Sequence, residues 1–360
     1  MNFASDNATI IAPEIFDAIA RANQGYSLAY GNDDHTRALE RRMSELFERE
    51  VATFLVATGT AANALAVAHF CQPWNAVLCH EASHLMTDEA GAPEFFGGGL
   101  KLIGIAGEKG KITPEALRHT IGIGRGVPHS VVPGVVSLSQ STEFGTVYRN
   151  EEVHALADVA HERGLAVHMD GARLANALVR NNGTLADATW RAGVDVLSFG
   201  ATKNGALAAE AVIFFDPAQA AGLASRRKRG GQLFSKHRFF AVQFEAYLRD
   251  GLWLKLARHA NAAASDLALG LTDIGLPPIW PVEANEVFVQ LPAAADRRLR
   301  AAGATYVSWP QEFLPNGTPA LADHKLVRLV TSFATTDADV EQFVIGMQVM
   351  PEHEFALEQH

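Results

Sequence analysis

Cysteine is scarce in this sequence of 360 residues: only Cys71 and Cys79 are present. Two cysteines are too few for a disulfide scaffold, and their spacing does not match the paired ligands of a zinc site. We therefore expect no metal site and interpret both residues as small apolar members of the core.

Positive charge is also in short supply. Lys and Arg number 30 against 40 for Asp and Glu, which gives a formal net charge of −10. Nucleic-acid binders draw much of their affinity from cations that neutralise phosphates, so this balance argues against a nucleic-acid partner. The one dense basic run, Arg226 to Arg229, is too short to reverse the argument.

Long apolar runs and low-complexity tracts are missing as well. No segment is long enough to span a bilayer, and the start, from Met1 to Asp6, lacks the charged and apolar regions of a secretory signal. We expect a cytoplasmic protein with no membrane partner. Apolar residues make up 48% of the chain, as in an ordinary folded protein, and its length favours a large domain with a smaller appendage.

Six short apolar runs alternate with helical patterns in the first two thirds of the chain. The runs are continuously apolar, as in strands that helices bury on both faces. This pattern predicts an α/β fold with a mostly parallel sheet. The runs are Val51 to Val56, Ala76 to Cys79, Val131 to Leu138, Leu165 to Met169, Val194 to Phe199 and Ala211 to Phe215.

Residues typical of helix ends lie between these runs. Asn150 is placed to cap a helix, and Gly164 supplies the left-handed residue that ends it. Pro114, directly after Thr113, starts another helix.

The pattern changes after about residue 236. A long helical stretch runs through Ala264, and strands follow near Glu286 to Leu291 and Lys325 to Val330. We expect an N-terminal arm over residues 1–32, a large α/β domain over 33–240, and the long helix with a small α+β domain over 241–360.

Two ionisable residues follow predicted strands. Lys203 lies in Ser198-Phe-Gly-Ala-Thr-Lys-Asn-Gly205 and Asp170 follows the preceding strand. Ligands bind at the carboxyl ends of strands in open α/β sheets, so one crevice should hold both side chains. This pair suits pyridoxal phosphate, because the amine can bind the cofactor covalently and the carboxylate can keep its pyridine nitrogen protonated. Singly, such residues are more often a turn and a solvated lysine, so the hypothesis depends on the pair.

The segment Ala57-Thr-Gly-Thr-Ala-Ala-Asn63 follows a strand and opens a helix. It would present the amides of Gly59, Thr60 and Ala61 to an anion, which makes it a candidate phosphate cup. The alternative is a capped turn without a ligand. The segment lacks a full dinucleotide fingerprint, so a nucleotide-dependent dehydrogenase is disfavoured.

Taken together, these motifs resemble the L-threonine aldolases of the β-eliminating lyase family, over nearly the whole chain. The resemblance implies a fold-type I enzyme that uses pyridoxal 5'-phosphate, with an aspartate-aminotransferase-like large domain, a mostly parallel seven-stranded sheet and a small α+β C-terminal domain. The motifs are Ser5-Asp6, Tyr30-Gly31, Ala57 to Asn63, Ser83-His84, Glu89-Ala-Gly91, His168-Met-Asp-Gly-Ala-Arg173, the Lys203 segment and Val327-Arg-Leu-Val-Thr331.

The resemblance also implies roles for single residues. His84 would stack on the cofactor ring and Asp170 would pair with the ring nitrogen, with Lys203 as the covalent anchor. The remaining candidates are Gly59, Thr60, Ala61 and Thr202 for the phosphate, Arg173 near the cofactor, and Ser5, Tyr30, Arg173 and Arg328 for the substrate. An arginine fork suits a carboxylate. Without the resemblance, Arg328 would be interpreted as a surface ion pair and His84 as a loop residue.

The same family places a basic, glycine-bearing stretch near the phosphate of a neighbouring subunit. Lys228 and Arg229 are the corresponding candidates here. The resemblance therefore implies a homo-oligomer, a tetramer built as a dimer of dimers, with active sites at subunit interfaces. The sequence alone does not separate a dimer from a tetramer.

One segment departs from the family pattern. Many relatives carry Thr-His-Asn-Gly after the strand that ends near Ser139, whereas this chain reads Ser141-Thr-Glu-Phe-Gly145. The missing histidine is a candidate for contacting the substrate hydroxyl. Its replacement around Glu143 and Phe144 leaves the identity of the base and the stereochemical preference open.

The implied activity is cleavage of L-threonine, L-allo-threonine or bulkier relatives such as phenylserine into glycine and an aldehyde. His84, directly or through a water, is the candidate base for the hydroxyl proton. Two alternatives stay open: another fold-type I enzyme, either an eliminating lyase or an aminotransferase, and a binding protein of the same ancestry without turnover. The preferred aldehyde and the physiological pathway are not fixed by the sequence.

Overall fold

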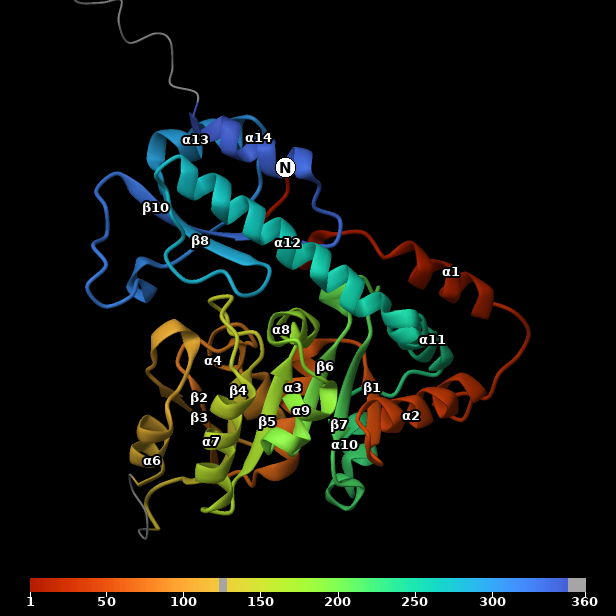
Figure 1. Ribbon diagram of the computed structural model, residues 1–360. Coiled ribbons are helices and arrows are strands. Elements are labelled where there is room, and N and C mark those ends of the chain that lie inside the picture. The colour runs from red at the N-terminus through yellow and green to blue at the C-terminus, as the bar shows by residue number, and fades with distance from the viewer. Residues whose placement is uncertain (123–127, 349–360) are drawn as a thin grey trace, which may run out of the picture.

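The computed structural model describes residues 1–122 and 128–348 (Figure 1). The chain forms a large α/β part on one sheet and a smaller part on a second sheet, joined by the long helix α12 (Leu252–Asp273). Residues 123–127 of the predicted large domain and 349–360 of the predicted C-terminal region lie outside the described residues.

The large sheet has seven strands in the order β1-β7-β6-β5-β4-β2-β3. Strand β7 runs antiparallel to both of its neighbours, and the other pairs are parallel. The expected mostly parallel seven-stranded sheet is therefore confirmed. The strands are β1 (Ala52–Val56), β2 (Asn75–His80), β3 (Lys101–Ile105), β4 (Val132–Ser139), β5 (Ala166–Gly171), β6 (Val196–Gly200) and β7 (Glu210–Phe214).

Strand β3 is the member of this sheet that the apolar pattern does not reveal. It lies at the edge and pairs only with β2. Its five residues include the exposed Lys101 and Gly104, which interrupt the apolar run. The other edge strand, β1, keeps a continuous apolar run, so the weak signal of β3 follows from these two exposed residues.

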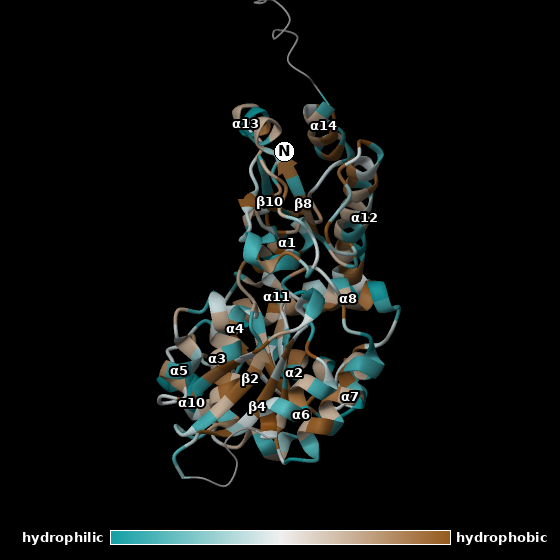
Figure 2. Cartoon of the chain, turned by 90° about the vertical axis from the view of Figure 1, so that its left-hand side faces the viewer, coloured by the Kyte–Doolittle hydropathy of each residue, from teal (hydrophilic) through white to brown (hydrophobic). Residues whose placement is uncertain are grey.

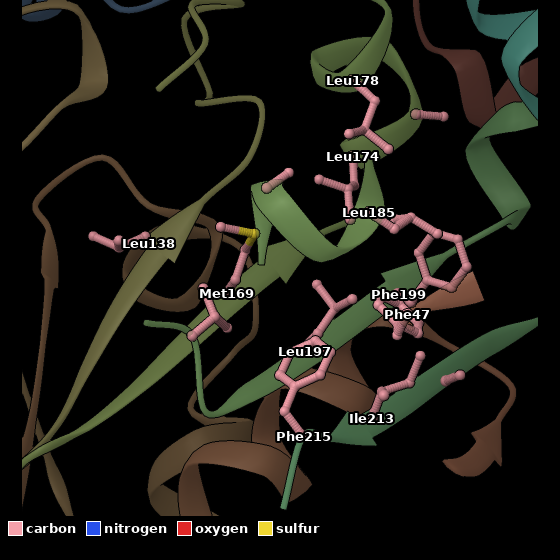
Figure 3. Close-up of a cluster of buried hydrophobic side chains, with 14 of the residues drawn as sticks. Phe47, Leu138, Met169, Leu174, Leu178, Leu185, Leu197, Phe199, Ile213 and Phe215 are labelled. Carbon is pink, nitrogen blue, oxygen red and sulfur yellow. The ribbon is translucent and has the colours of Figure 1, made fainter. Parts of the chain in front are cut away.

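Helices cover both faces of the sheet (Figure 2), and successive strand residues point to opposite faces. Leu197 and Phe199 of β6 enter the core drawn in Figure 3, whereas Val196 packs on the other face beside α3. One face carries α3 (Gly59–Phe70), α5 (Ala92–Phe96) and α10 (Leu223–Arg229). The other carries α2 (Asp34–Leu46), α6 (Pro114–Gly122), α7 (Asn150–His161), α8 (Leu174–Asn181), α9 (Leu185–Ala188) and α11 (Arg238–Leu248).

The predicted helix boundaries are largely confirmed. Helix α6 begins at Pro114, and the Thr113 hydroxyl accepts the Ala116 N–H at 3.2 Å. Gly164 has the expected positive φ of 70°. The predicted cap of α7 is wrong by one residue, because Arg149 is the cap and Asn150 is already the first helical residue.

The predicted single helical stretch through Ala264 is wrong. The chain forms α11 and α12 with a break at Arg249–Gly251. Asp250 and Gly251 have positive φ values of 50° and 70°. Aspartate tolerates this conformation and glycine adopts it freely, so the Asp-Gly pair ends one helix and redirects the chain into the next.

The smaller part packs helices on an antiparallel sheet ordered β8-β10-β9. Its elements are β8 (Glu286–Pro292), α13 (Ala293–Ala301), β9 (Val307–Ser308), β10 (His324–Val330) and α14 (Asp337–Gln348). Among the described residues, no helix has both the length and the apolar character needed to cross a bilayer.

The N-terminal segment lies against both parts of the molecule (Figure 1). Phe3 is fully buried in the smaller part, where its ring meets Phe343 edge-on at 5.2 Å. The short turn η1 (Asp6–Ala8) then crosses between the parts, and α1 (Pro13–Ala22) packs on α11. This path carries Ser5 and its neighbours past the carboxyl ends of the large sheet.

Candidate active site

The carboxyl ends of β4, β5 and β6 border two adjoining cavities of about 240 Å³ each. We call them the helix-side cavity, lined by Gly59, Thr60 and Thr202, and the arginine-side cavity, lined by Ser5, Arg173 and Arg328. His84, Asp170 and Lys203 line both. The structure thus brings the amine and the carboxylate into the one crevice that the sequence predicts.

Lys203 is held by its neighbours in the short turn η4 (Thr202–Asn204). The Asn204 side-chain amide donates to the Tyr247 hydroxyl and to the Trp253 carbonyl, both at 2.9 Å. Gly205 follows at a φ of +109°, and a Cβ there would come within 3.0 Å of the Ala12 side chain. The turn is therefore fixed to the core directly beside the reactive lysine.

Asp170 is buried near the end of β5 and is held by two donors. The Asn63 side chain donates to it at 2.9 Å and the Ala172 N–H at 3.0 Å. Burial alone would raise its pKa, but the positive charges of His84 and Lys203 outweigh burial and hold the pKa below its usual value. Asp170 is consequently ionised and able to bind a protonated ring nitrogen.

His84 opens the short helix α4 (His84–Thr87) and is oriented by Glu89. Its Nδ1 lies 3.0 Å from the Glu89 carboxylate, and this hydrogen bond raises the pKa of His84. The Asn63 amide reaches the same carboxylate at 2.8 Å, so Asn63 links Glu89 with Asp170. Sequence reasoning quoted Asn63 and Glu89 within motifs but assigned neither a role.

The candidate phosphate cup lies at the start of α3. Gly59 and Thr60 line the helix-side cavity, and their amides precede the first intrahelical hydrogen bond. The Ala61 N–H donates to the Thr58 hydroxyl at 3.1 Å, so this amide already has a partner within the chain, and its predicted contact with the phosphate stays a prediction. Thr202 Oγ1 accepts the Ala209 N–H at 3.1 Å, and its own proton has no acceptor within residues 1–122 and 128–348.

Arg173 and Arg328 both line the arginine-side cavity, but they are held differently. Arg173 donates from Nε and Nη2 to the two oxygens of Asp6, at 2.7 and 3.0 Å. Both arginines also approach Glu286 Oε1, Arg173 at 3.5 Å and Arg328 at 3.7 Å. Arg328 lies in addition over the Trp309 ring at 4.7 Å. One edge of the Arg173 fork is therefore already engaged within the chain, a partner that sequence reasoning missed although Asp6 lies in a quoted motif.

Tyr30, Lys228 and Arg229 do not reach either cavity within one chain. Lys228 Nζ lies over the Tyr30 ring at 5.0 Å, and Tyr30 lines a separate cavity of about 60 Å³ with Arg227. Arg229 lines a fourth hollow beside α5 and α10. Any contact of these residues with the Lys203 site would have to be made to a second copy of the chain.

The sequence model of the β-eliminating lyase family matches residues 2–294. The chain belongs to this family.

Two curated members are similar over most of their length. A low specificity L-threonine aldolase of Pseudomonas aeruginosa is 46% identical over 302 residues, which cover 84% of this chain and 87% of the relative. A second low specificity L-threonine aldolase, from a Pseudomonas species, is 44% identical over the same shares of the two chains.

Solved structures confirm the predicted fold class. A threonine aldolase of Leishmania major superposes with a TM-score of 0.89 at 30% identity and covers 96% of this chain and 98% of its own. A serine palmitoyltransferase of Sphingomonas wittichii, 16% identical with a TM-score of 0.70 and covering 96% and 86%, shares the fold.

The residues of this family member fit pyridoxal phosphate. The helix-side cavity is lined by a lysine amine, an ionised buried aspartate, the N-terminus of α3 and, from η4, the hydroxyl of Thr202. Glu210, which the sequence did not single out, also lines it and accepts the Thr202 N–H at 3.3 Å. Within residues 1–122 and 128–348, no group of side chains is arranged to hold a metal ion.

Proposed function

We propose that this protein is a pyridoxal-phosphate-dependent aldolase that cleaves L-threonine, L-allo-threonine and related β-hydroxy-α-amino acids such as phenylserine into glycine and an aldehyde. One observation carries the proposal: Lys203 and the ionised Asp170 line the same cavity, which also contains the N-terminus of α3. The family membership and the 46% identity to an L-threonine aldolase point to the same carbon–carbon lyase reaction.

Five residues would hold the cofactor. Lys203 Nζ binds it covalently, and Asp170 keeps the ring nitrogen protonated. The Gly59 and Thr60 amides and the Thr202 hydroxyl bind the phosphate. When bound, pyridoxal phosphate supplies an electron-poor ring that takes up the electron pair of the broken bond.

The arginine-side cavity would hold the amino acid. Arg328 binds the substrate carboxylate with Ser5, and Arg173 contributes the donors that Asp6 does not use. This grip sets which bond of the α-carbon stands in line for cleavage. His84 would lie against the ring, and a base on the chain would take the hydroxyl proton as the Cα–Cβ bond breaks. Protonation at Cα completes glycine.

The active unit is proposed to be a homo-oligomer, a tetramer built as a dimer of dimers. Tyr30, Lys228 and Arg229 then contribute to the cavities of a neighbouring subunit, which accounts for their distance from Lys203 in one chain. We place the protein in the cytoplasm, and its two buried free thiols suit a reducing compartment. A fully active monomer at micromolar concentration, measured by light scattering, would contradict the shared site.

The function is tested by incubating the holoenzyme with L-threonine, L-allo-threonine and L-phenylserine and measuring glycine and aldehyde. Lys203→Ala should lose both the visible cofactor band and the cleavage, while Lys101→Ala, at an exposed lysine on the edge strand, should keep both. A Lys203-dependent band with ammonia and a keto acid as products would assign a different reaction. If no such band appears after reconstitution with pyridoxal phosphate, the proposal of a pyridoxal-phosphate enzyme is rejected.

A further inference from the structure

Ser139 and Glu143 form a hydrogen-bonded pair on the wall of the arginine-side cavity. Ser139 is the last residue of β4, and its hydroxyl donates to Glu143 Oε1 at 2.8 Å. The backbone N–H of His84 donates to the same oxygen at 2.8 Å. The next residue, Phe144, stacks on Trp280 at 4.7 Å, so the loop that carries Glu143 is fixed to the smaller part of the molecule.

Glu143 is placed to hold a proton near neutral pH. Its Oε2 is shielded from solvent and meets no hydrogen-bond partner in the described part of the chain. Burial raises the pKa of Glu143 to about 7, and the two hydrogen bonds to Oε1 offset this only in part. A carboxyl group whose pKa lies near the working pH is suited to exchange protons during catalysis.

Ser139 connects this carboxylate to the cavity. A serine hydroxyl has one proton and two lone pairs, and the Ser139 proton is already directed at Glu143. No donor within residues 1–122 and 128–348 points at Ser139 Oγ, so its lone pairs are free to accept a hydrogen bond from a substrate hydroxyl. The Nδ1 atom of His84, by contrast, is already engaged, because it lies 3.0 Å from the Glu89 carboxylate.

We infer that Ser139 and Glu143 together are the base that removes the β-hydroxyl proton of the substrate. The inference rests on the aldolase function proposed above. The substrate proton passes to Ser139 Oγ as the Ser139 proton passes to Glu143 Oε1. The electron pair of the substrate O–H bond becomes the second C–O bond of the aldehyde. The pair of the broken Cα–Cβ bond stays with the glycine half and takes up one proton at Cα, so no oxidant or reductant is needed.

Other charged groups face the pair, and the negative charge of Asp170 adds to burial in raising the pKa of Glu143. They come from α4, β5, η4, the start of α8 and β10, and are His84, Asp170, Lys203, Arg173 and Arg328, with Asp88 also on the cavity wall. Cys79 and Tyr148, behind Glu143, stay neutral because burial raises the pKa of both, that of Cys79 to about 12. Cleavage therefore requires an ionised Glu143 and should rise with pH through about 7.

The experiment compares two reactions of the same holoenzyme. Glycine has no β-hydroxyl, so exchange of its α-proton with solvent, followed by NMR, does not need the pair. Glu143→Gln and Ser139→Ala should each slow L-threonine cleavage by about 10²–10³-fold and leave glycine exchange within a few-fold of wild type. The double variant should be no slower than either single variant, because both remove the same relay.

The outcomes separate the inference from the function on which it rests. The inference is overturned if the wild type cleaves L-threonine and both single variants cleave it at the wild-type rate. It is also overturned if the variants slow glycine exchange by the same factor as cleavage. In both cases the aldolase function stands. If the wild type neither cleaves L-threonine nor exchanges glycine, both fail. Should Glu143→Gln not fold, the wild type still decides: cleavage should have an acid limb near pH 7 that glycine exchange lacks, and a limb shared by both reactions would overturn the relay.

Discussion

Asp6 and Arg173 lie 167 positions apart in the sequence and form a two-pronged ion pair at 2.7 and 3.0 Å between the N-terminal segment and the loop after β5. Both side chains are almost fully shielded from solvent. Asn285 adds a third donor to Asp6 at 3.1 Å. The pair therefore attaches the N-terminal segment to the wall of the arginine-side cavity and fixes the orientation of Arg173.

Asp6→Asn should destabilise the protein. Removing one partner of a buried ion pair typically costs about 3–5 kcal/mol. Burial would raise the pKa of Asp6, but the charges of Arg173 and Lys203 outweigh it, so the folded pKa lies below the unfolded value of about 3.9. The stabilisation is then fully present above about pH 4 and disappears as pH falls through the folded pKa.

Urea unfolding of wild type and Asp6→Asn at several pH values measures this contribution. The difference in unfolding free energy should be largest near neutral pH and shrink in acid. Glu45→Gln breaks an exposed pair with Arg42 and serves as the matched control, which should change stability little at any pH. An equal difference for Asp6→Asn at all pH values would contradict the ion-pair account.

A second prediction concerns the fixing of Lys203. Asn204→Ala removes two hydrogen bonds, to the Tyr247 hydroxyl and to the Trp253 carbonyl. A shift of the lysine by about 1 Å can cost about 10²-fold in rate, so cleavage should fall by up to that factor although Lys203 itself is unchanged. Tyr247→Phe removes only one of the two acceptors and should have a smaller effect. Wild-type cofactor retention and rate in Asn204→Ala would refute the role of this clamp.

Much of the fold could be predicted because its signals are local. The central strands are buried on both faces, so their apolar runs stand out in the sequence, and Lys203 and Asp170 could be placed from the strands that precede them. The edge strand β3 and the break at Asp250 gave weak signals, since one has little apolar surface and the other interrupts an otherwise helical pattern.

The partners of the site residues could not be predicted in the same way. Asn63 binds Asp170 across 107 positions, and Asp6 binds Arg173 across 167. Such contacts depend on how the elements pack, and a single sequence contains no signal for them. The partner of the Ala61 amide is local: the Thr58 side chain caps α3 and accepts the N–H at position N3.

A third prediction concerns Glu210 in the helix-side cavity. Burial raises the pKa of Glu210 to about 7, against about 4.3 in an unfolded chain. Because the folded pKa is raised, ionisation opposes folding: the wild type should lose stability as pH rises from about 4.3 to about 7, by at most about 3 kcal/mol. Glu210→Gln removes this loss. The unfolding free energies of the cofactor-free proteins at pH 5 and pH 8 test it, and a variant whose advantage does not grow with pH would contradict the assignment.

The fourth prediction links the core of Figure 3 to the active site. Phe199 is fully buried and its ring lies 5.9 Å from that of Trp253 and 6.4 Å from that of Tyr247, the two residues that hold Asn204. Phe199→Ala should cost about 3–5 kcal/mol of stability and, by loosening the clamp, weaken cofactor retention as well.

Phe214 provides the matched control for this link. It is equally buried, but it packs on the opposite face of the sheet, against Phe54 and Phe70, away from the clamp. Phe214→Ala should therefore lower the unfolding free energy by a similar amount while the folded protein keeps its cofactor. Equilibrium dialysis measures how much cofactor each variant retains. It is carried out without denaturant, at the pH at which both variants are most stable. Equal loss of cofactor from the two variants would show that stability alone, and not the packing of Phe199 on the residues that hold Asn204, controls retention.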